Sequence, residues 1–177
     1  MKKKIWFVAL FVVLSIPVVR VGDSVISIFC RDNPNGISLG LISVGAEARD
    51  IIALGPAWGN AGRDIVSSIG FSCGKAGRDI VSFIGLAGGK AGRDIKAGAG
   101  FAGGKAERDI VSLFGLAGGN AGRDIFSVLG IIGGKTERDI KAILGFAGGV
   151  ESGRVSGLLA LKYEKGEIRL SAFWLPI

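Results

Sequence analysis

The residues of this chain best suited to chemistry are seven Arg-Asp pairs, which begin at positions 49, 63, 78, 93, 108, 123 and 138. A guanidinium beside a carboxylate can bind a charged ligand or hold a reacting group by hydrogen bonds. The chain contains no histidine, the commonest general base and metal ligand. Seven equivalent positions are also a poor way to build one active centre. We therefore predict a protein that is not an enzyme and that uses no cofactor and no metal.

The Arg-Asp pairs are more simply interpreted as a structural ladder. Stacked from repeat to repeat, they form rows of guanidinium and carboxylate groups about 4.8 Å apart. Rows of one sign repel, whereas neighbouring rows of opposite sign offset each other. A periodic surface for a charged polymer or glycan is the functional alternative. The predicted ladder consists of Arg63, Asp64, Arg78, Asp79, Arg93, Asp94, Arg108, Asp109, Arg123, Asp124, Arg138 and Asp139.

The pairs belong to a 15-residue repeat whose most regular marker is a glycine, at positions 40, 55, 70, 85, 100, 115, 130 and 145. Within one unit the pattern is that of a strand with one buried face, since Ile80, Ser82 and Ile84 alternate with Val81 and Phe83. The position of Val81 is a lysine in two sister copies, so we expect its face to point outward. The inward face then carries isoleucine and a small companion, always Ser or Ala.

A unit this short cannot enclose a core alone, but stacked units can. We predict an all-β repeat solenoid of about seven to eight coils of 15 residues. A C-terminal β-hairpin cap is predicted because LLALKYE and EIRLSAF alternate on either side of Lys165-Gly166. The alternative is an array of short α-helices, each broken by glycine. A glycine inside each helix would cost about 1 kcal/mol relative to alanine, which favours the solenoid.

Two known families share features of this repeat. The first copy, GISLGLISVGAEARDIIALG at residues 36–55, resembles the fifteen-residue surface-repeat proteins of bacterial envelopes. Their Gly-Leu-aliphatic-polar-aliphatic step matches residues 40–44, and Arg49 falls in the charged turn. The DIVS-x-x-G rhythm of later copies is similar to that of bactofilin-like polymer-forming solenoids. Both resemblances imply a stacked β architecture, and the first implies an envelope location without a settled activity.

The N-terminus has the layout of a targeting segment. Three lysines precede an apolar run from Ile5 to Ile16, which is shorter than the about 20 residues of a spanning helix. No small-x-small cleavage site is evident in IPVVRVGDS, so an uncleaved membrane anchor stays open. We predict export to the cell envelope or the extracellular space. The predicted division is 1–22 signal peptide or anchor, 23–35 N-terminal cap, 36–153 repeat solenoid, and 154–177 C-terminal strand or hairpin cap.

Charge and cysteine content exclude other classes. The formal charge is +7, but much of it lies in Lys2, Lys3, Lys4 and Arg20 around the apolar run. The repeats interleave both signs, unlike the one-sided basic stripe of a nucleic-acid interface. Two cysteines, at positions 30 and 73, are too few for a disulfide framework. They either pair with each other or are unrelated small residues.

The outward apolar residues are the second candidate surface. Exposed apolar strips mark interfaces or membrane contacts, although these residues would instead be covered if the coil had a second layer. The predicted strip contains Val81, Phe83, Val111, Leu113, Phe126 and Val128.

From these features we expect a non-enzymatic exported repeat protein that acts as an envelope scaffold or interaction surface. Its expected partner is another copy of itself or an envelope component, with membrane contact through the N-terminal segment. The alternative is a membrane-associated protein that is anchored by an uncleaved N-terminus and carries helical repeats at the bilayer.

Overall fold

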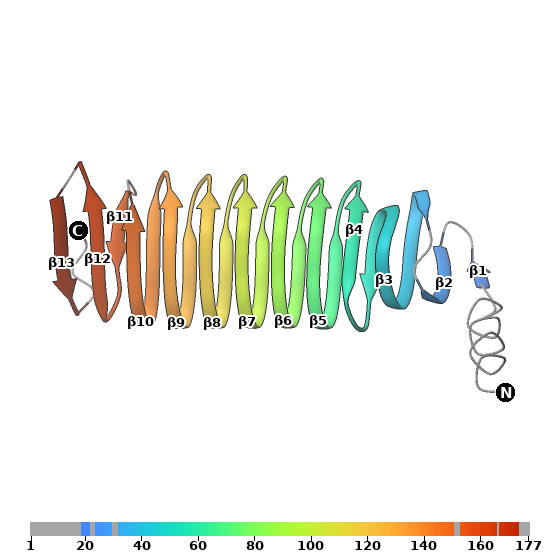
Figure 1. The fold of residues 1–177 in the computed structure, drawn as a ribbon, viewed down its shortest axis with the longest axis horizontal. Coiled ribbons are helices and arrows are strands. Elements are labelled where there is room, and N and C mark those ends of the chain that lie inside the picture. Colours follow the sequence, from blue (N-terminus) through green and yellow to red (C-terminus); the bar gives the residue numbers. More distant parts are fainter. Residues whose placement is uncertain (1–18, 22–23, 30–31, 151–152, 166, 174–177) are drawn as a thin grey trace, which may run out of the picture.

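The chain forms a β-solenoid. The computed structural model describes residues 19–21, 24–29, 32–150, 153–165 and 167–173, and the described residues are all-β, with about eight stacked turns (Figure 1). The solenoid prediction is confirmed, and the helical alternative is wrong, because none of these residues is helical. The strands are β1 (Val19–Val21), β2 (Ser24–Phe29), β3 (Asn33–Ala53), β4 (Ala57–Ala61), β5 (Ile65–Ala76), β6 (Ile80–Ala91), β7 (Ile95–Ala106), β8 (Ile110–Ala121), β9 (Ile125–Thr136), β10 (Asp139–Val150), β11 (Arg154–Ser156), β12 (Leu159–Glu164) and β13 (Glu167–Ala172).

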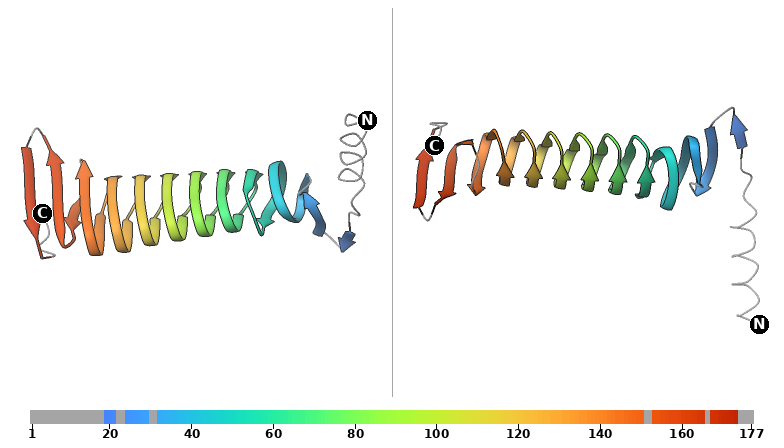
Figure 2. Two further views of the ribbon diagram at one scale, coloured as in Figure 1. Left: turned by 60° about the horizontal axis from the view of Figure 1, so that its bottom comes forward. Right: turned by 90° about the horizontal axis from the view of Figure 1, so that it is seen from above.

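From β5 to β10, each repeat contributes one 12-residue strand that bends back on itself, and a short turn leads to the next strand (Figures 1 and 2). From β5 to β10 every strand pairs in parallel with the next at an offset of 15 residues, as in Ile80↔Ile95 and Ile95↔Ile110. Equivalent side chains therefore lie directly over one another. The stacking supplies the backbone hydrogen bonds that a 15-residue unit cannot make alone.

The interior of the coil is narrow and lined by small residues. The isoleucine column, from Ile51 and Ile65 to Ile125 and Ile140, is fully buried, as predicted. Its Ser or Ala companion is buried as well, and the second half of each coil adds buried alanines such as Ala87 and Ala91. Burial of one isoleucine stabilises a fold by about 1.5–3 kcal/mol, so this column is the main apolar contribution of each coil.

One predicted inward residue points the other way. Ile84 is 56% exposed, although its alternation with Ile80 and Ser82 placed it in the core. The chain has already begun to turn at Phe83, so Phe83 and Ile84 both face outward. Ser82, the last inward residue before the bend, donates a hydrogen bond of 3.3 Å to the carbonyl of Gly70 in the preceding coil.

The glycine column marks the bend in the middle of each strand. Gly85 has φ of 125° and Gly115 has φ of 128°, values that side chains rarely permit. A Cβ atom on Gly115 would lie 2.1 Å from the carbonyl oxygen of Gly100 one coil earlier. The bend and the tight stacking therefore both require glycine at this position.

The first coil departs from the register predicted by the glycines. Ile51 pairs with Ile65 at an offset of 14 residues, so the Arg-Asp-Ile units stay stacked. The Leu54 N–H donates to the carbonyl of Gly40, which places Gly40 beside Leu54 instead of Gly55. A register shift between Val44 and Ala46 marks the irregularity of this coil. At this end of the solenoid, the Arg-Asp-Ile unit therefore marks the repeat register better than the glycine does.

Antiparallel pairs close the described solenoid at both ends. β12 pairs in parallel with β10 and in antiparallel with β13, which confirms the predicted C-terminal hairpin. β1 pairs in antiparallel with β2 at the other end. Because β1 and β13 run opposite to the strands that they pair with, the parallel stack ends at β2 and β12.

Removal of one full repeat, residues 90–104, is expected to leave a shorter protein that still folds, because the remaining columns realign. Removal of residues 90–96 alone shifts every later column and is expected to abolish cooperative folding. Far-UV circular dichroism and thermal unfolding of both deletions test this prediction. Equal behaviour of the two variants would contradict stacking in register.

The substitution Gly115→Ala is expected to destabilise the protein by about 2 kcal/mol or more, since it combines a positive φ with a blocked Cβ position. Gly148→Ala is the control, because a Cβ there meets no atom closer than 3.9 Å. Urea unfolding measures both. Equal losses of stability would show that the bend does not depend on glycine.

Candidate functional site

The two long edges of the solenoid carry different chemistry. One edge contains the turns between strands, where the Gly-Arg-Asp or Glu-Arg-Asp segments lie. The other edge contains the bends in the middle of the strands, as the ribbon in Figure 1 shows along its lower side. The Arg-Asp ladder and the exposed apolar residues therefore lie at opposite edges of the same rod.

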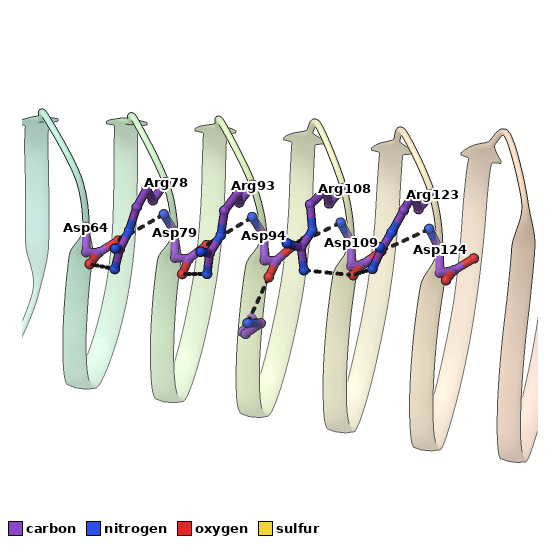
Figure 3. Close-up of polar contacts among 10 residues, drawn as sticks. Asp64, Arg78, Asp79, Arg93, Asp94, Arg108, Asp109, Arg123 and Asp124 are labelled. Atoms are coloured by element: carbon purple, nitrogen blue, oxygen red, sulfur yellow. Dashed lines mark hydrogen bonds and ion pairs between the residues drawn. The ribbon is translucent and has the colours of Figure 1, made fainter.

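The Arg-Asp ladder joins successive coils through bidentate ion pairs. The guanidinium of Arg78 donates to both carboxylate oxygens of Asp64, at 3.2 and 2.7 Å. The same arrangement links Arg93 to Asp79 and Arg123 to Asp109 (Figure 3). Each ladder arginine thus contacts the aspartate of the coil before it, and Arg63, Arg108 and Arg138 do so through single ion pairs of 3.3, 3.4 and 3.9 Å. The predicted ladder residues are brought together as one continuous row.

The aspartates also satisfy a backbone donor that the sheet leaves over. In each turn the arginine N–H binds the carbonyl of the preceding arginine, as Arg93 N–H does to Arg78 at 2.8 Å. The N–H of the next residue, Asp94, instead donates to Oδ1 of Asp79 at 3.2 Å. A buried N–H without a partner costs about 1–3 kcal/mol. The carboxylate column is therefore part of the fold as well as a row of charge.

A lysine changes the ladder in two coils. Lys96 and Lys141 occupy the Val81 column, and their ammonium groups lie 2.9 and 2.8 Å from Asp94 and Asp139. Arg108 is consequently held less closely, with Nε 3.4 Å from Asp94 Oδ1.

These lysines lower the pKa of their aspartates. Burial alone would raise the pKa of Asp94, but it lies below its ordinary value of 3.8. The hydrogen bond and charge of Lys96, the charge of Arg108 and the N–H of Asp109 outweigh burial. The pKa of Asp139 is lowered mainly by its hydrogen bond from Lys141. Both carboxylates are ionised at neutral pH and engaged in structural contacts, which leaves them poorly suited to proton transfer.

The opposite edge carries a continuous row of exposed apolar side chains, which we call the apolar ridge. It is formed at the bends by residues just before and after the glycine column, and their exposed fractions lie between 39% and 64%. The ridge consists of Ile69, Phe83, Ile84, Leu86, Phe101, Leu113, Phe114, Leu116, Leu129, Ile131, Ile143, Leu144 and Phe146.

The apolar ridge overlaps the predicted strip only in part. Phe83 and Leu113 are exposed, at 60% and 44%, and belong to both. Val81, Val111 and Phe126 are half-buried on the face beside the ladder and do not join the ridge, and Val128 lies at the bend but is also half-buried. The missed residues come from the Ile84 and Leu86 columns. A signal was present, because the Ile84 column varies from Ala99 to Phe114, more than a narrow core would tolerate.

Lysines line the face between the apolar ridge and the ladder turns. Lys75, Lys90 and Lys105 stack in register and are exposed. Within the described part of the chain, no carboxylate lies within ion-pair distance of these three. They form a positive row four residues beyond the Leu86 column.

Other candidate sites are less developed. Cys73 is a free thiol whose pKa is raised by burial, and Cys30 lies outside the described residues, as does the pairing considered for it. Among the described residues, no three His, Cys, Asp or Glu side chains cluster as metal ligands would. In the described ranges there is no helix that is long and apolar enough to cross a membrane.

Comparison with known proteins adds no relative: no protein-family model, curated protein or solved structure matches the chain. The functional argument therefore depends on the geometry of the two edges.

Asp94→Asn is expected to destabilise the protein by about 1–3 kcal/mol at neutral pH, since it removes the charge that Lys96 and Arg108 contact. The folded pKa of Asp94 is below 3.8, so its contribution is complete above that pH and is lost as the pH falls through the folded pKa. Urea unfolding at pH 7 and pH 2 should show the gap to wild type closing in acid. Glu107→Gln, at an exposed turn position, is the control with little effect at either pH. An unchanged gap at pH 2 would contradict the assignment.

Proposed function

We propose that the protein is a non-enzymatic, exported scaffold of the cell envelope that uses one side of a rigid rod as an extended interaction surface. The observation that carries the proposal is the apolar ridge, which runs along the repeats and remains exposed after the core has formed. Exposed apolar patches of this extent mark binding surfaces.

The distribution of contacts supports a scaffold over a catalyst. The carboxylates and guanidiniums that could do chemistry are engaged with each other and with the backbone from coil to coil. Each coil presents the same groups as the one before it. Such a surface suits an extended partner better than a single small substrate.

The location is proposed from the sequence. Lys2, Lys3 and Lys4 followed by an apolar run are typical of export signals or N-terminal anchors. The resemblance of residues 36–55 to surface-repeat proteins of bacterial envelopes agrees with this location. Self-association and contact with an envelope component are the two kinds of partnership that the proposal includes. The alternative of helical repeats at the bilayer is not retained, since the repeats are strands.

Fusion of alkaline phosphatase to the C-terminus tests the location, because this enzyme becomes active only outside the bacterial cytoplasm. We expect an active fusion that fractionates with the envelope. Deletion of residues 2–16 is the matched control and should abolish the activity while the fusion is still made. An inactive full-length fusion that accumulates intact in the cytoplasm would overturn the proposed location.

A further inference from the structure

We propose that the apolar ridge binds the surface of an anionic lipid bilayer, with the rod lying along the membrane and the ridge side chains inserted among the acyl chains. This inference deepens the proposed function, since it names the partner of the interaction surface. It concerns the repeats themselves and is independent of the N-terminal segment.

The composition of the apolar ridge fits a lipid environment. The bends comprise residues 68–71, 83–86, 98–101, 113–116, 128–131 and 143–146, and Ser68 is the only residue among them that is neither apolar nor glycine. No charged group interrupts this edge over six coils, a length of about 24 Å at 4.8 Å per coil. A long apolar face beneath a polar body is the pattern of elements that lie in the membrane interface.

The backbone at the ridge tolerates such an environment. The parallel ladder skips the pair of Phe83 and Gly98 and resumes within the bend, with pairs Ile84↔Ala99, Gly85↔Gly100 and Leu86↔Phe101. In the columns of Ile84, Gly85 and Leu86, strands are thus paired between coils where the rod would enter the lipid. A peptide group without a partner would cost several kcal/mol in hydrocarbon. The ladder edge, which depends on carboxylates to complete its hydrogen bonds, would not meet this requirement.

The positive row lies between the apolar ridge and the ladder turns, where it lines a hollow together with Gly77, Gly92 and Glu107. Lys75, Lys90 and Lys105 follow the last ridge column by four residues, at most about 13 Å along the chain. Interfacial elements bury their apolar face by about 5–10 Å, which leaves a lysine on this row within reach of phosphate. Lys96 and Lys141 stand on the opposite face of the coil, where their ammonium groups pair with Asp94 and Asp139 of the ladder.

Acidic groups are kept away from the edge that carries the apolar ridge. Between residues 65 and 146 every Asp and Glu lies in or beside the turns of the ladder edge. The aspartates there are paired with arginine or lysine, as in Arg93–Asp79 and Lys96–Asp94. The rod is thus apolar at one edge, positive on its flank and charge-balanced at the far edge. This polarity is complementary to an anionic bilayer.

The shape of the ridge favours lipid over a second copy of the chain. The ribbon bends sharply along this edge (Figure 1). The exposed ridge residues occupy only about three columns, those of Phe83, Ile84 and Leu86. Two rigid convex edges would touch along a line and leave the outer columns in water. A fluid bilayer can close around a convex edge and bury all three columns. In a pair of rods, the positive rows of the two copies would also repel each other. Lipid phosphate groups would instead neutralise the charge of these lysines.

Site-specific fluorescence in the full-length chain tests the proposal. In a background with Cys30→Ser and Cys73→Ser, an NBD fluorophore is attached at Phe114→Cys on the ridge or at Glu107→Cys on the ladder edge. Leu129→Cys is a second ridge position, and circular dichroism verifies that each labelled chain is folded. The proteins are reconstituted in vesicles of phosphatidylglycerol and phosphatidylcholine, with or without bromine atoms on the acyl chains.

We expect a blue shift and loss of most of the fluorescence in brominated vesicles for both ridge positions, and neither effect for position 107. The quenching should weaken in vesicles of phosphatidylcholine alone, because the lysine row then lacks anionic partners. Equal quenching in both lipids would remove the anionic lipid from the proposal.

Three results would overturn it. The ridge labels would stay unquenched if the rod stood away from the bilayer. They would show a concentration-dependent blue shift without quenching if a second copy covered the ridge. Quenching of positions 107 and 114 alike would show that the rod has no preferred edge. An inactive phosphatase fusion with ridge quenching intact would refute the proposed location while leaving the lipid affinity of the ridge standing.

Discussion

The contact on which the rest of this structure depends is the approach of each corner glycine to the carbonyl of the coil before it. A Cβ atom on Gly85 would lie 1.8 Å from the oxygen of Gly70, so no side chain fits while the coils remain stacked. This contact allows the chain to bend within a continuous parallel ladder. The bend in turn makes the coil so narrow that the isoleucine column is opposed mainly by serine and alanine, with Ile132 the large exception. The repeat length, the small interior and the high glycine content follow from it.

The two edges of the coil are constrained to different degrees by this backbone. At the ladder edge, the aspartate accepts a hydrogen bond from a main-chain N–H one coil later, so a short carboxylate is needed for folding. At the apolar ridge, the ladder pairs the backbone on both sides of the Phe83 column without help from side chains, and the ridge side chains are exposed. The core gains little from large side chains there, since Ile84 and Phe114 are more than half exposed and their column also accommodates Ala99. Their apolar character is therefore better explained by binding than by stability.

The sequence alone predicted the stacked β architecture and the isoleucine column, because repeated alternation at a fixed period has few other solutions. It misplaced Ile84, since alternation was extended through a bend whose position depends on the φ of Gly85. It assigned charge balance to Asp79 but not the hydrogen bond from Asp94 N–H, which exists only once the coils are stacked. The glycine period likewise placed Gly40 one residue out, because the first coil is shorter by one residue.

Repetition also explains how modest contacts could give useful affinity. A single exposed side chain of the ridge contributes at most about 1.5–3 kcal/mol when it leaves water, and part of that is already lost through neighbouring contacts. Once one coil is bound, however, the next lies about 4.8 Å away and at the same height, so its ridge residues are held at high effective concentration. Ion pairs between successive coils, such as Arg78–Asp64, restrict the rotation of one coil relative to the next. The rigidity of the ladder edge and the binding capacity of the opposite edge are thus linked. If the coils were flexible, the conformational entropy lost on binding would offset the free energy gained from the ridge contacts.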